Sequence, residues 1–349
     1  MWIFYRPDAI TVWENEEVRN RLSWYRKVMV NEKPAKYLIC KRIEADIDLK
    51  DAGYDELWHE HERLAIEFNK TWNKIKNGEL ELADLRRAKI SFLDLKVEIA
   101  NRILENCHFC ERRCGVNRKK GEKGFCKLTD KSFLASYFHH YGEEAPLVPS
   151  STFFMSSCTF RCVHCQNWDI STDPTNGIEI TPPLLATLIE KLRKEGGLNT
   201  NFVGGDPVPH IHTIIEAMKY TDINVPMLWN SNFYMSTEAT KLLIHIIDIG
   251  LPDFKYGNDF CALRLSNVSN YFEVVSRNHK MFHDESIDSI VRILVLPNHV
   301  ECCVKPVLKW LADNCPNFLV NIMSQYRPCL LYTSPSPRDL STSRMPSSA

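Results

Sequence analysis

Between residues 150 and 328 the sequence alternates short apolar runs with amphipathic stretches, and this alternation limits the fold more than any other feature. Apolar runs typical of buried strands lie at 152–156, 201–204, 225–229, 252–255, 290–296 and 318–323. Between them, apolar residues recur every three or four positions, as after Thr181, where Pro182 can begin a helix and Gly196 can end it. Repeated strand–helix units predict an α/β fold with a parallel sheet, either open or wrapped into a partial barrel.

Composition divides the remainder of the chain into three segments. Residues 1–105 are charged and have mostly helical periodicity, and we interpret them as a helical extension packed on the main domain, with a short strand at 35–43. Residues 106–149 form a cysteine-rich segment. Residues 329–349 are rich in Ser, Pro and Thr without periodicity, so we leave them out of the fold as a disordered or non-native tail.

Charge and cysteine content bear on partners and compartment. The 43 basic and 44 acidic residues nearly balance, which gives no reason to expect nucleic acid or a membrane as a partner. The most apolar window, 242–251, is too short to span a bilayer, and no secretory signal begins the chain. We therefore expect a cytoplasmic protein whose clustered cysteines are metal ligands. The other six cysteines show no ligand spacing and are interpreted as buried or incidental thiols: Cys40, Cys261, Cys302, Cys303, Cys315 and Cys329.

Three cysteines follow the first predicted strand of this region in a C-x3-C-x2-C pattern: Cys158, Cys162 and Cys165. Three thiolates on one tight loop can bind three irons of a [4Fe–4S] cubane and leave the fourth iron open. A structural zinc site is the alternative, but it needs a fourth ligand, and the nearest candidate, His164, lies between two of the cysteines. The spacing favours an iron–sulfur cluster over zinc or incidental thiols.

A second set of cysteines lies upstream: Cys107, Cys110, Cys114 and Cys126. Four thiols at such short spacing predict a closed site for zinc or for an accessory iron–sulfur cluster, and the spacing does not separate the two. The loop before Cys126 contains glycines and can fold back around a metal. The basic residues of this segment are interpreted as solvated rather than as a docking surface for an acidic partner: Arg112, Arg113, Arg118, Lys119, Lys120 and Lys123.

Taken together, these motifs resemble the radical S-adenosylmethionine (SAM) superfamily, and in particular its pyruvate formate-lyase activating-enzyme-like branch. The resemblance covers about residues 103–328 and includes CTFRCVHCQNWDIS, NFVGGDP, WNSNFY, PDFKYGND, VRILVLP and NIMSQYRP. It implies a partial TIM-like (β/α)6 barrel with the cluster at the carboxyl-terminal mouth of the strands. A similar upstream cysteine block occurs in an uncharacterised subgroup of this branch.

The resemblance implies two groups of SAM contacts close to the cluster. His164 occupies the position of an aromatic residue that packs beside the cluster, where the backbone meets adenine. Gly204, Gly205 and Asp206 match a glycine–glycine–acid motif that approaches the amino group of SAM. Small residues at such a motif allow close approach of backbone and ligand.

Further contacts are implied at later strand ends. Asp253 and Lys255 match a D-x-K pattern, in which alternation along a strand places both side chains on one face. Arg292 matches an arginine near SAM, and an arginine inside an apolar run is costly without a partner. Asn230 and Asn232 end the third strand and are expected to face the same cavity. Because Asn230 replaces an acid of related enzymes, we do not expect their bound monovalent cation here.

Polar residues between the two cysteine sets are weaker candidates. In FHHYGEEAP, Glu143 and Glu144 are expected to line the approach to the site, whereas His139 and His140 are candidate ligands or bases. Tyr326 lies where related enzymes often have a SAM-facing histidine. Lone histidines and surface acids are usually neither ligands nor catalysts.

The activity implied by the resemblance is reductive cleavage of SAM by the [4Fe–4S] cluster, to a 5′-deoxyadenosyl radical that abstracts hydrogen from a substrate. The expected partner is a one-electron donor such as flavodoxin or ferredoxin. The family suggests a glycyl-radical enzyme as the substrate, while another protein or a small metabolite are alternatives. A competing interpretation is a non-catalytic zinc or iron–sulfur module for protein interaction or regulation.

Overall fold

The computed structural model describes residues 4–326 and 329. Within these residues, eight strands form one sheet in the order β3-β1-β2-β4-β5-β6-β7-β8. Neighbouring strands run parallel in a set of six: β2 (Ser150–Met155), β4 (Asn199–Gly204), β5 (Met227–Trp229), β6 (Ile249–Gly250), β7 (Asp288–Leu294) and β8 (Leu319–Met323). β1 (Phe133–His140) and β3 (Ile178–Glu179) extend the β2 edge in antiparallel fashion. In the described part of the chain β8 does not pair with β3, so the predicted partial (β/α)6 barrel is confirmed as an open one.

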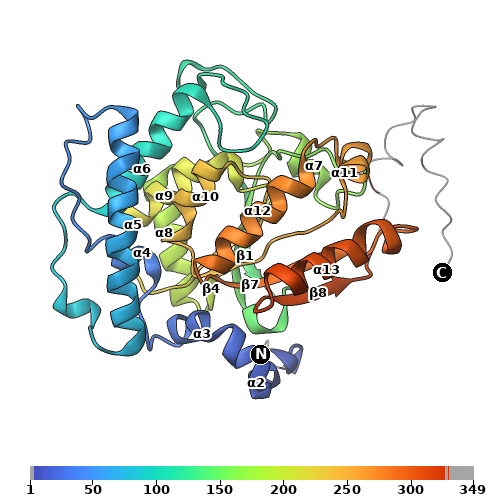
Figure 1. Ribbon diagram of the computed structural model, residues 1–349, viewed down its shortest axis with the longest axis horizontal. Coiled ribbons are helices and arrows are strands. Elements are labelled where there is room, and N and C mark those ends of the chain that lie inside the picture. Colours follow the sequence, from blue (N-terminus) through green and yellow to red (C-terminus); the bar gives the residue numbers. More distant parts are fainter. Residues whose placement is uncertain (1–3, 327–328, 330–349) are drawn as a thin grey trace.

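Helices that follow the strands surround the sheet (Figure 1). They are α8 (Pro182–Lys194), α9 (Ile211–Ala217), α10 (Thr237–Ile244), α12 (Tyr271–Asp284) and α13 (Lys305–Asn314), with two short helices, α7 (Trp168–Thr172) and α11 (Asp259–Ser266), between them. α8 forms as predicted, with Thr181 at its N-cap, Pro182 at its first position and Leu185 and Ile189 buried. None of the helices in residues 4–326 is long and apolar enough to cross a membrane.

The amino-terminal region is helical and packs on the sheet. Its helices are α1 (Asp8–Thr11), α2 (Glu16–Arg21), α3 (Ser23–Met29), α4 (Lys36–Cys40), α5 (Tyr54–Asn77) and α6 (Phe92–Ile103). α5 and α6 lie along one flank of the molecule, whereas α3 lies under the sheet (Figure 1).

α3 closes the amino-terminal end of the strands. A small hydrophobic cluster joins it to β5, β6 and β7: Leu22, Tyr25, Met29, Leu147, Leu228, Ile249, Leu251 and Ile290. The Tyr25 hydroxyl accepts a hydrogen bond from Asn199 at 3.0 Å, and its backbone N–H donates to Asp288 at 2.8 Å. Asn199 and Asp288 are the first residues of their strands, so these bonds fix α3 to the strand starts.

A buried carboxylate secures the next connection. Asp248 accepts hydrogen bonds from the indole N–H of Trp24 at 2.9 Å, from the backbone of Lys36 at 3.0 Å and from the backbone of Met227 at 2.9 Å. Burial raises the pKa of Asp248 to about 6. One side chain therefore ties α3 and α4 to the start of β5.

Two predicted elements differ from the structure. The strand expected at 35–43 is wrong, because this segment forms α4; all five helical residues are buried, so the helix has no polar face and leaves no helical period in the sequence. The strand expected at 252–255 lies earlier, at β6, and leaves only an isolated bridge between Asp253 and Arg292. The mostly apolar window 242–251 hid the boundary, because α10 ends at Ile244 and β6 begins at Ile249 within it.

Candidate active site at the cysteine loop

The cysteine loop connects β2 to α7, at the carboxyl ends of the parallel strands. Each sulfur has a polar neighbour within hydrogen-bonding distance: the backbone N–H of Phe160 at 3.3 Å from Cys158, the hydroxyl of Ser266 at 2.9 Å from Cys162 and the hydroxyl of Ser171 at 3.3 Å from Cys165. Burial raises the pKa of Cys162 to about 11 and that of Cys158 well above its usual value. Without metal these two thiols stay protonated at neutral pH, so a metal must displace their protons.

The glycine pair packs directly against the start of this loop. Gly204 has a φ of 125°, and a Cβ there would lie 2.1 Å from the carbonyl oxygen of Met155. A Cβ at Gly205 would lie 2.0 Å from the carbonyl oxygen of Ser157, while the Gly205 N–H donates to Met155 at 2.8 Å. Backbone packing therefore requires glycine at both positions, and the contact with SAM stays a prediction.

Asp206 and Asn232 lie buried beneath the cysteine loop. The Asp206 carboxylate accepts hydrogen bonds from the Thr159 hydroxyl at 2.6 Å and from the Asn232 amide at 3.0 Å. The same amide nitrogen lies 2.9 Å from the Thr159 hydroxyl oxygen and 3.9 Å from the Cys158 sulfur. Burial raises the pKa of Asp206 to about 6. These contacts join the ends of β4 and β5 to the loop, which indicates a positioning role for both side chains.

Arg292 is the centre of a charged cluster beside the loop. Its guanidinium lies 3.3 Å from Asp253 and 3.7 Å from Glu143, and it donates to the side-chain oxygen of Asn230. Lys255 donates to the other oxygen of Asp253 at 2.6 Å, so Asp253 and Lys255 lie together as predicted. Burial opposes ionisation of Asp253, but Lys255 and Arg292 outweigh it and hold the pKa of that carboxyl below its usual value.

Several buried polar atoms around this cluster lack a hydrogen-bond partner. They are Nδ2 of Asn230, Nδ1 of His164 and Oε2 of Glu144. Burial also lowers the pKa of His164 to about 3, so its ring is neutral. Unpaired buried donors and acceptors are costly, and their gathering next to the cysteine loop fits the binding of a polar ligand.

Three of the four weaker candidates lie at or near this charged cluster, and one lies elsewhere. Glu143 accepts from Asn201 at 3.0 Å, and burial raises its pKa to about 7 although Arg292 opposes the shift. Glu144 accepts from Asn321 at 2.8 Å. His140 lies 3.9 Å from Glu143, but His139 faces Glu195, on the other side of β1, at 3.9 Å.

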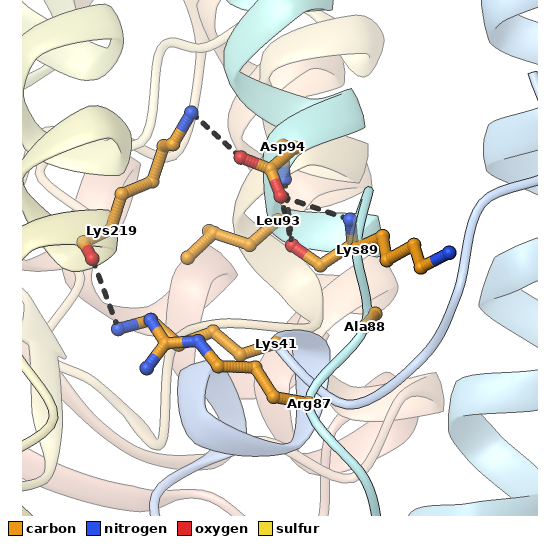
Figure 2. Close-up of a pocket in the computed structure, with 8 residues that line it drawn as sticks. Lys41, Arg87, Ala88, Lys89, Leu93, Asp94 and Lys219 are labelled. Carbon is orange, nitrogen blue, oxygen red and sulfur yellow. Dashed lines mark hydrogen bonds and ion pairs between the residues drawn. The ribbon is translucent and has the colours of Figure 1, made fainter. Parts of the chain in front are cut away.

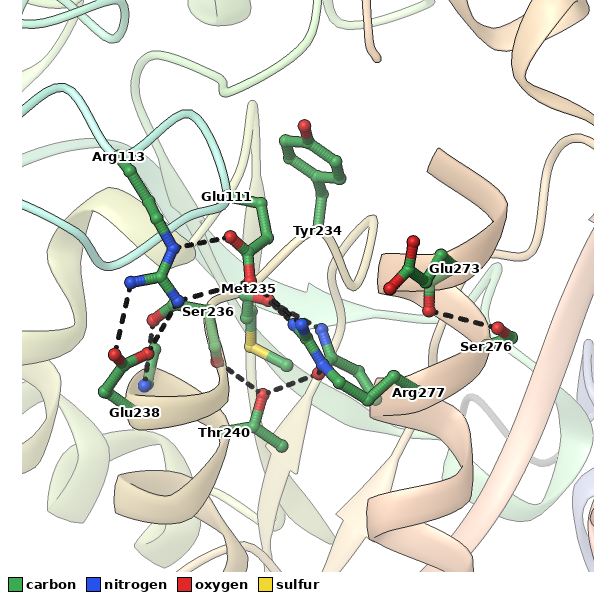
Figure 3. Close-up of polar contacts among 12 residues, drawn as sticks. Glu111, Arg113, Tyr234, Met235, Ser236, Glu238, Thr240, Glu273, Ser276 and Arg277 are labelled. Carbon is green, nitrogen blue, oxygen red and sulfur yellow. Dashed lines mark hydrogen bonds and ion pairs between the residues drawn. The ribbon is translucent and has the colours of Figure 1, made fainter. Parts of the chain in front are cut away.

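The upstream cysteine segment is docked on α10 and α12 by ion pairs (Figure 3). Glu111 contacts Arg277 at 2.9 Å and Arg113 at 2.7 Å, and Arg113 reaches Glu238 at 2.9 Å. Cys110 forms an isolated antiparallel bridge with Met235, in the segment that follows β5. The segment is therefore anchored at the same strand end as Asn230 and Asn232.

The two cysteine segments touch each other. The Ser157 hydroxyl donates to the carbonyl of Cys126 at 2.6 Å, and Arg112 donates to the carbonyl of Thr159 at 2.7 Å. Arg118 is buried and donates to the carbonyl of Pro209 at 2.9 Å. The interpretation of these two arginines as solvated is wrong, because both donate hydrogen bonds to backbone carbonyls of other segments, and Arg118 is buried.

One group of metal-ligand atoms converges where no spacing predicted it. In the described part of the chain, four potential ligands come together: Cys261, His299, Cys302 and Cys303. Their ligand atoms all lie within 4.8 Å of one another. The interpretation of these three cysteines as buried or incidental thiols did not anticipate this convergence. The short H-x2-C-C stretch was the available signal, but the fourth ligand lies 38 positions earlier than His299.

A pocket of about 210 Å³ lies away from these groups, against α6 (Figure 2). Lys41, Arg87 and Lys219 line it, and Lys219 pairs with Asp94 at 2.6 Å. Lys41 donates to Asp222 at 2.8 Å. None of the predicted site residues lines this pocket, so we do not assign it to the reaction.

Comparisons with known proteins agree with the site. The profile described as the Radical SAM superfamily matches residues 152–311. The chain is 43% identical over 314 residues to the uncharacterized protein MJ0674 of Methanocaldococcus jannaschii, across 88% of this chain and 89% of that protein. It is 35% identical over 95 residues to the uncharacterized protein MJ0808 of the same organism, across 22% of this chain and 28% of that protein.

Solved structures overlap with part of the chain. Streptococcus suis SuiB bound to S-adenosylmethionine gives a TM-score of 0.37 at 12% identity, over 48% of this chain and 39% of that one. A second structure, anSMEcpe with bound AdoMet, gives a TM-score of 0.35 at 15% identity, over 53% and 54%. These overlaps are partial, and we draw nothing about substrate from them.

Proposed function

Because this chain belongs to the radical SAM superfamily, we propose that Cys158, Cys162 and Cys165 hold a [4Fe–4S] cluster whose open iron binds SAM. The observation that carries the proposal is the placement of three sulfurs on one loop at the strand ends, beside charged and unpaired polar groups. When bound, the cluster and SAM supply one-electron cleavage of the sulfonium and hence radical chemistry.

The protein's own groups stabilise charge at the sulfurs. The hydroxyls of Ser266 and Ser171 and the N–H of Phe160 lie where they can donate to thiolates. The hydroxyl of Tyr256 lies 2.5 Å from that of Ser266, which extends the first of these contacts into the core. Such hydrogen bonds to sulfur favour the more negative, reduced state and raise the reduction potential.

We propose that the charged cluster receives the amino-acid end of SAM. Lys255 and Arg292 provide positive charge for its carboxylate, and Nδ2 of Asn230 provides a donor without a partner. Gly204 and Gly205 keep the adjacent backbone close to the cysteine loop. Asp206, by contrast, bonds to protein groups and acts by holding Thr159 in place.

For the substrate, we propose a protein with a reactive glycine, as in the activating-enzyme-like branch, with electrons supplied by flavodoxin or ferredoxin. A small metabolite is the alternative. The two are separated by isotope transfer: a peptide carrying deuterated glycine should deliver deuterium to 5′-deoxyadenosine. Deuterium transfer only from metabolites would reject the protein substrate.

For the upstream set, Cys107, Cys110, Cys114 and Cys126, we propose a metal site that holds either zinc or an accessory iron–sulfur cluster. Iron and sulfide content of variants in this set distinguishes the two metals.

The test of the central proposal is anaerobic reconstitution with iron and sulfide, reduction with dithionite and assay of 5′-deoxyadenosine released from SAM. Alanine at Cys158, Cys162 or Cys165 should abolish release. Cys315→Ala is the matched control, since Cys315 is also a buried free thiol but lies at the end of α13. Full release by the loop variants overturns the assignment. A colourless zinc protein inert to SAM supports the non-catalytic module instead.

A further inference from the structure

Four side chains from two separate parts of the chain converge on one point beyond the proposed active site. Cys261 lies in the first turn of α11, His299 follows β7, and Cys302 and Cys303 lie in a π-helical turn (Val300–Val304). π-Helical turns are rare and occur frequently at functional sites. We propose that these four residues form a structural metal site, with zinc as its ion.

The distances between the ligand atoms fit a single tetrahedral ion. Nδ1 of His299 lies 3.3 Å from the sulfur of Cys302, 3.6 Å from that of Cys261 and 3.7 Å from that of Cys303. The sulfur of Cys302 lies 4.0 Å from that of Cys261 and 3.8 Å from that of Cys303. Tetrahedral zinc, with bonds of about 2.3 Å to sulfur and about 2.0 Å to nitrogen, requires about 3.8 Å between sulfurs and about 3.5 Å between sulfur and nitrogen.

Neither a disulfide nor a hard cation fits these four residues as well as zinc does. A disulfide needs its sulfurs about 2.05 Å apart, far closer than those seen here, and all three cysteines are free. Hard cations such as Mg²⁺ and Ca²⁺ prefer oxygen ligands, and this group offers none. Three sulfurs and one imidazole make a complete Cys3His set, which leaves no open position and indicates a structural rather than a catalytic ion.

The surrounding backbone is built for this convergence. Asn258 caps α11 by accepting from the N–H of Cys261 at 2.9 Å, and its amide donates to the carbonyl of Cys302 at 2.8 Å. A Cβ on Gly257 would lie 2.7 Å from that same carbonyl oxygen. One residue therefore connects the two ligand-bearing segments, and its neighbour must be glycine for them to approach.

The position of the ion links it to the cysteine loop. α11 has eight residues, with Cys261 near its start and Ser266 at its end. The carbonyl of Ser266 accepts from Arg161 at 3.0 Å, and the Ser266 hydroxyl reaches the sulfur of Cys162 at 2.9 Å. An ion at the start of α11 fixes the helix that carries this contact.

The test is zinc content of the full chain after dialysis against a weak chelator. Cys302→Ala and His299→Ala should each lose one equivalent of zinc relative to the wild type, and Cys315→Ala should lose none. X-ray absorption at the zinc edge should show three sulfurs and one nitrogen. Unchanged zinc in the Cys302 and His299 variants overturns the site.

A second measurement needs no variant and covers the case in which a substitution prevents folding. Cys302 is exposed, so as a free thiol it is accessible to iodoacetamide, whereas a metal-bound thiolate should be protected. We expect alkylation of Cys302 in the folded protein only after a strong chelator is added. Immediate alkylation without chelator, or a disulfide at Cys302 in the reduced preparation, contradicts the proposal.

Discussion

Replacing Gly204 by alanine should separate β4 from the start of the cysteine loop. Two costs add at this position. An L-residue at a φ of 125° carries backbone strain of about 1–3 kcal/mol. The new Cβ would also lie 2.1 Å from the carbonyl oxygen and 2.3 Å from the nitrogen of Met155, both backbone atoms that cannot rotate away, and such overpacking costs about 1–3 kcal/mol more.

Gly196→Ala is the matched control. Gly196 has a φ of 103°, but a Cβ there meets nothing within 4 Å, so this variant carries the strain without the overlap. The gain from a stiffer unfolded chain is the same in both variants and cancels. Unfolding in urea should therefore show Gly204→Ala to be less stable than Gly196→Ala by about 1–3 kcal/mol. Equal losses would refute the reasoning, because the overlap with Met155 would then have no energetic effect.

Further predictions concern the cluster, the second metal site and pH. Ser266→Ala removes the hydroxyl beside Cys162 and should lower the reduction potential by on the order of tens of millivolts in a redox titration followed by electron paramagnetic resonance, whereas Ser276→Ala, which loses a bond inside α12, should not. Gly257→Ala should push the carbonyl of Cys302 away and speed zinc loss to a chelator; an unchanged rate would count against the proposed geometry. Burial lowers the pKa of nine histidines: His61, His139, His140, His164, His210, His212, His245, His279 and His299. It raises the pKa of four acids: Glu143, Asp206, Asp248 and Asp288. The histidines stabilise the fold above about pH 6.5 and lose that contribution in acid, while the acids act in the opposite sense. Because more histidines than acids are shifted in this way, stability should fall on balance as the pH drops from 6 to 5. A urea midpoint that rises between pH 6 and pH 5 would contradict this balance.

Local patterns in the sequence predicted much of the fold and of the cysteine loop. Five of the six parallel strands and the cap of α8 follow from short stretches whose periodicity each element imposes on its own residues. Asp253 and Lys255 lie together as predicted, but through their ion pair beyond the end of β6 and not within the expected strand. α4 escaped prediction because burial on all sides removes the polar face that marks a helix.

Contacts between residues that are far apart in the sequence could not be predicted from the spacing of motifs. Cys261 meets His299 and Cys302 only because α11 and the π-helical turn pack together. The role of Gly204 is similar, since the atoms that exclude a side chain there belong to Met155, on another strand. In both cases the decisive contact joins elements that are distant in sequence.

The position of α3 has a practical consequence for shortening the chain. A fragment that begins at β1 would retain the cysteine loop at residues 158–165, but it would lose Tyr25 from the strand starts. The fragment would then expose an apolar surface formed by Leu228, Ile249 and Ile290. The carboxylate of Asp248 would also lose two of its hydrogen-bond donors. A minimal catalytic barrel cut from this protein should therefore aggregate, and its amino-terminal helices must be retained in any trimmed version intended for crystallisation or expression.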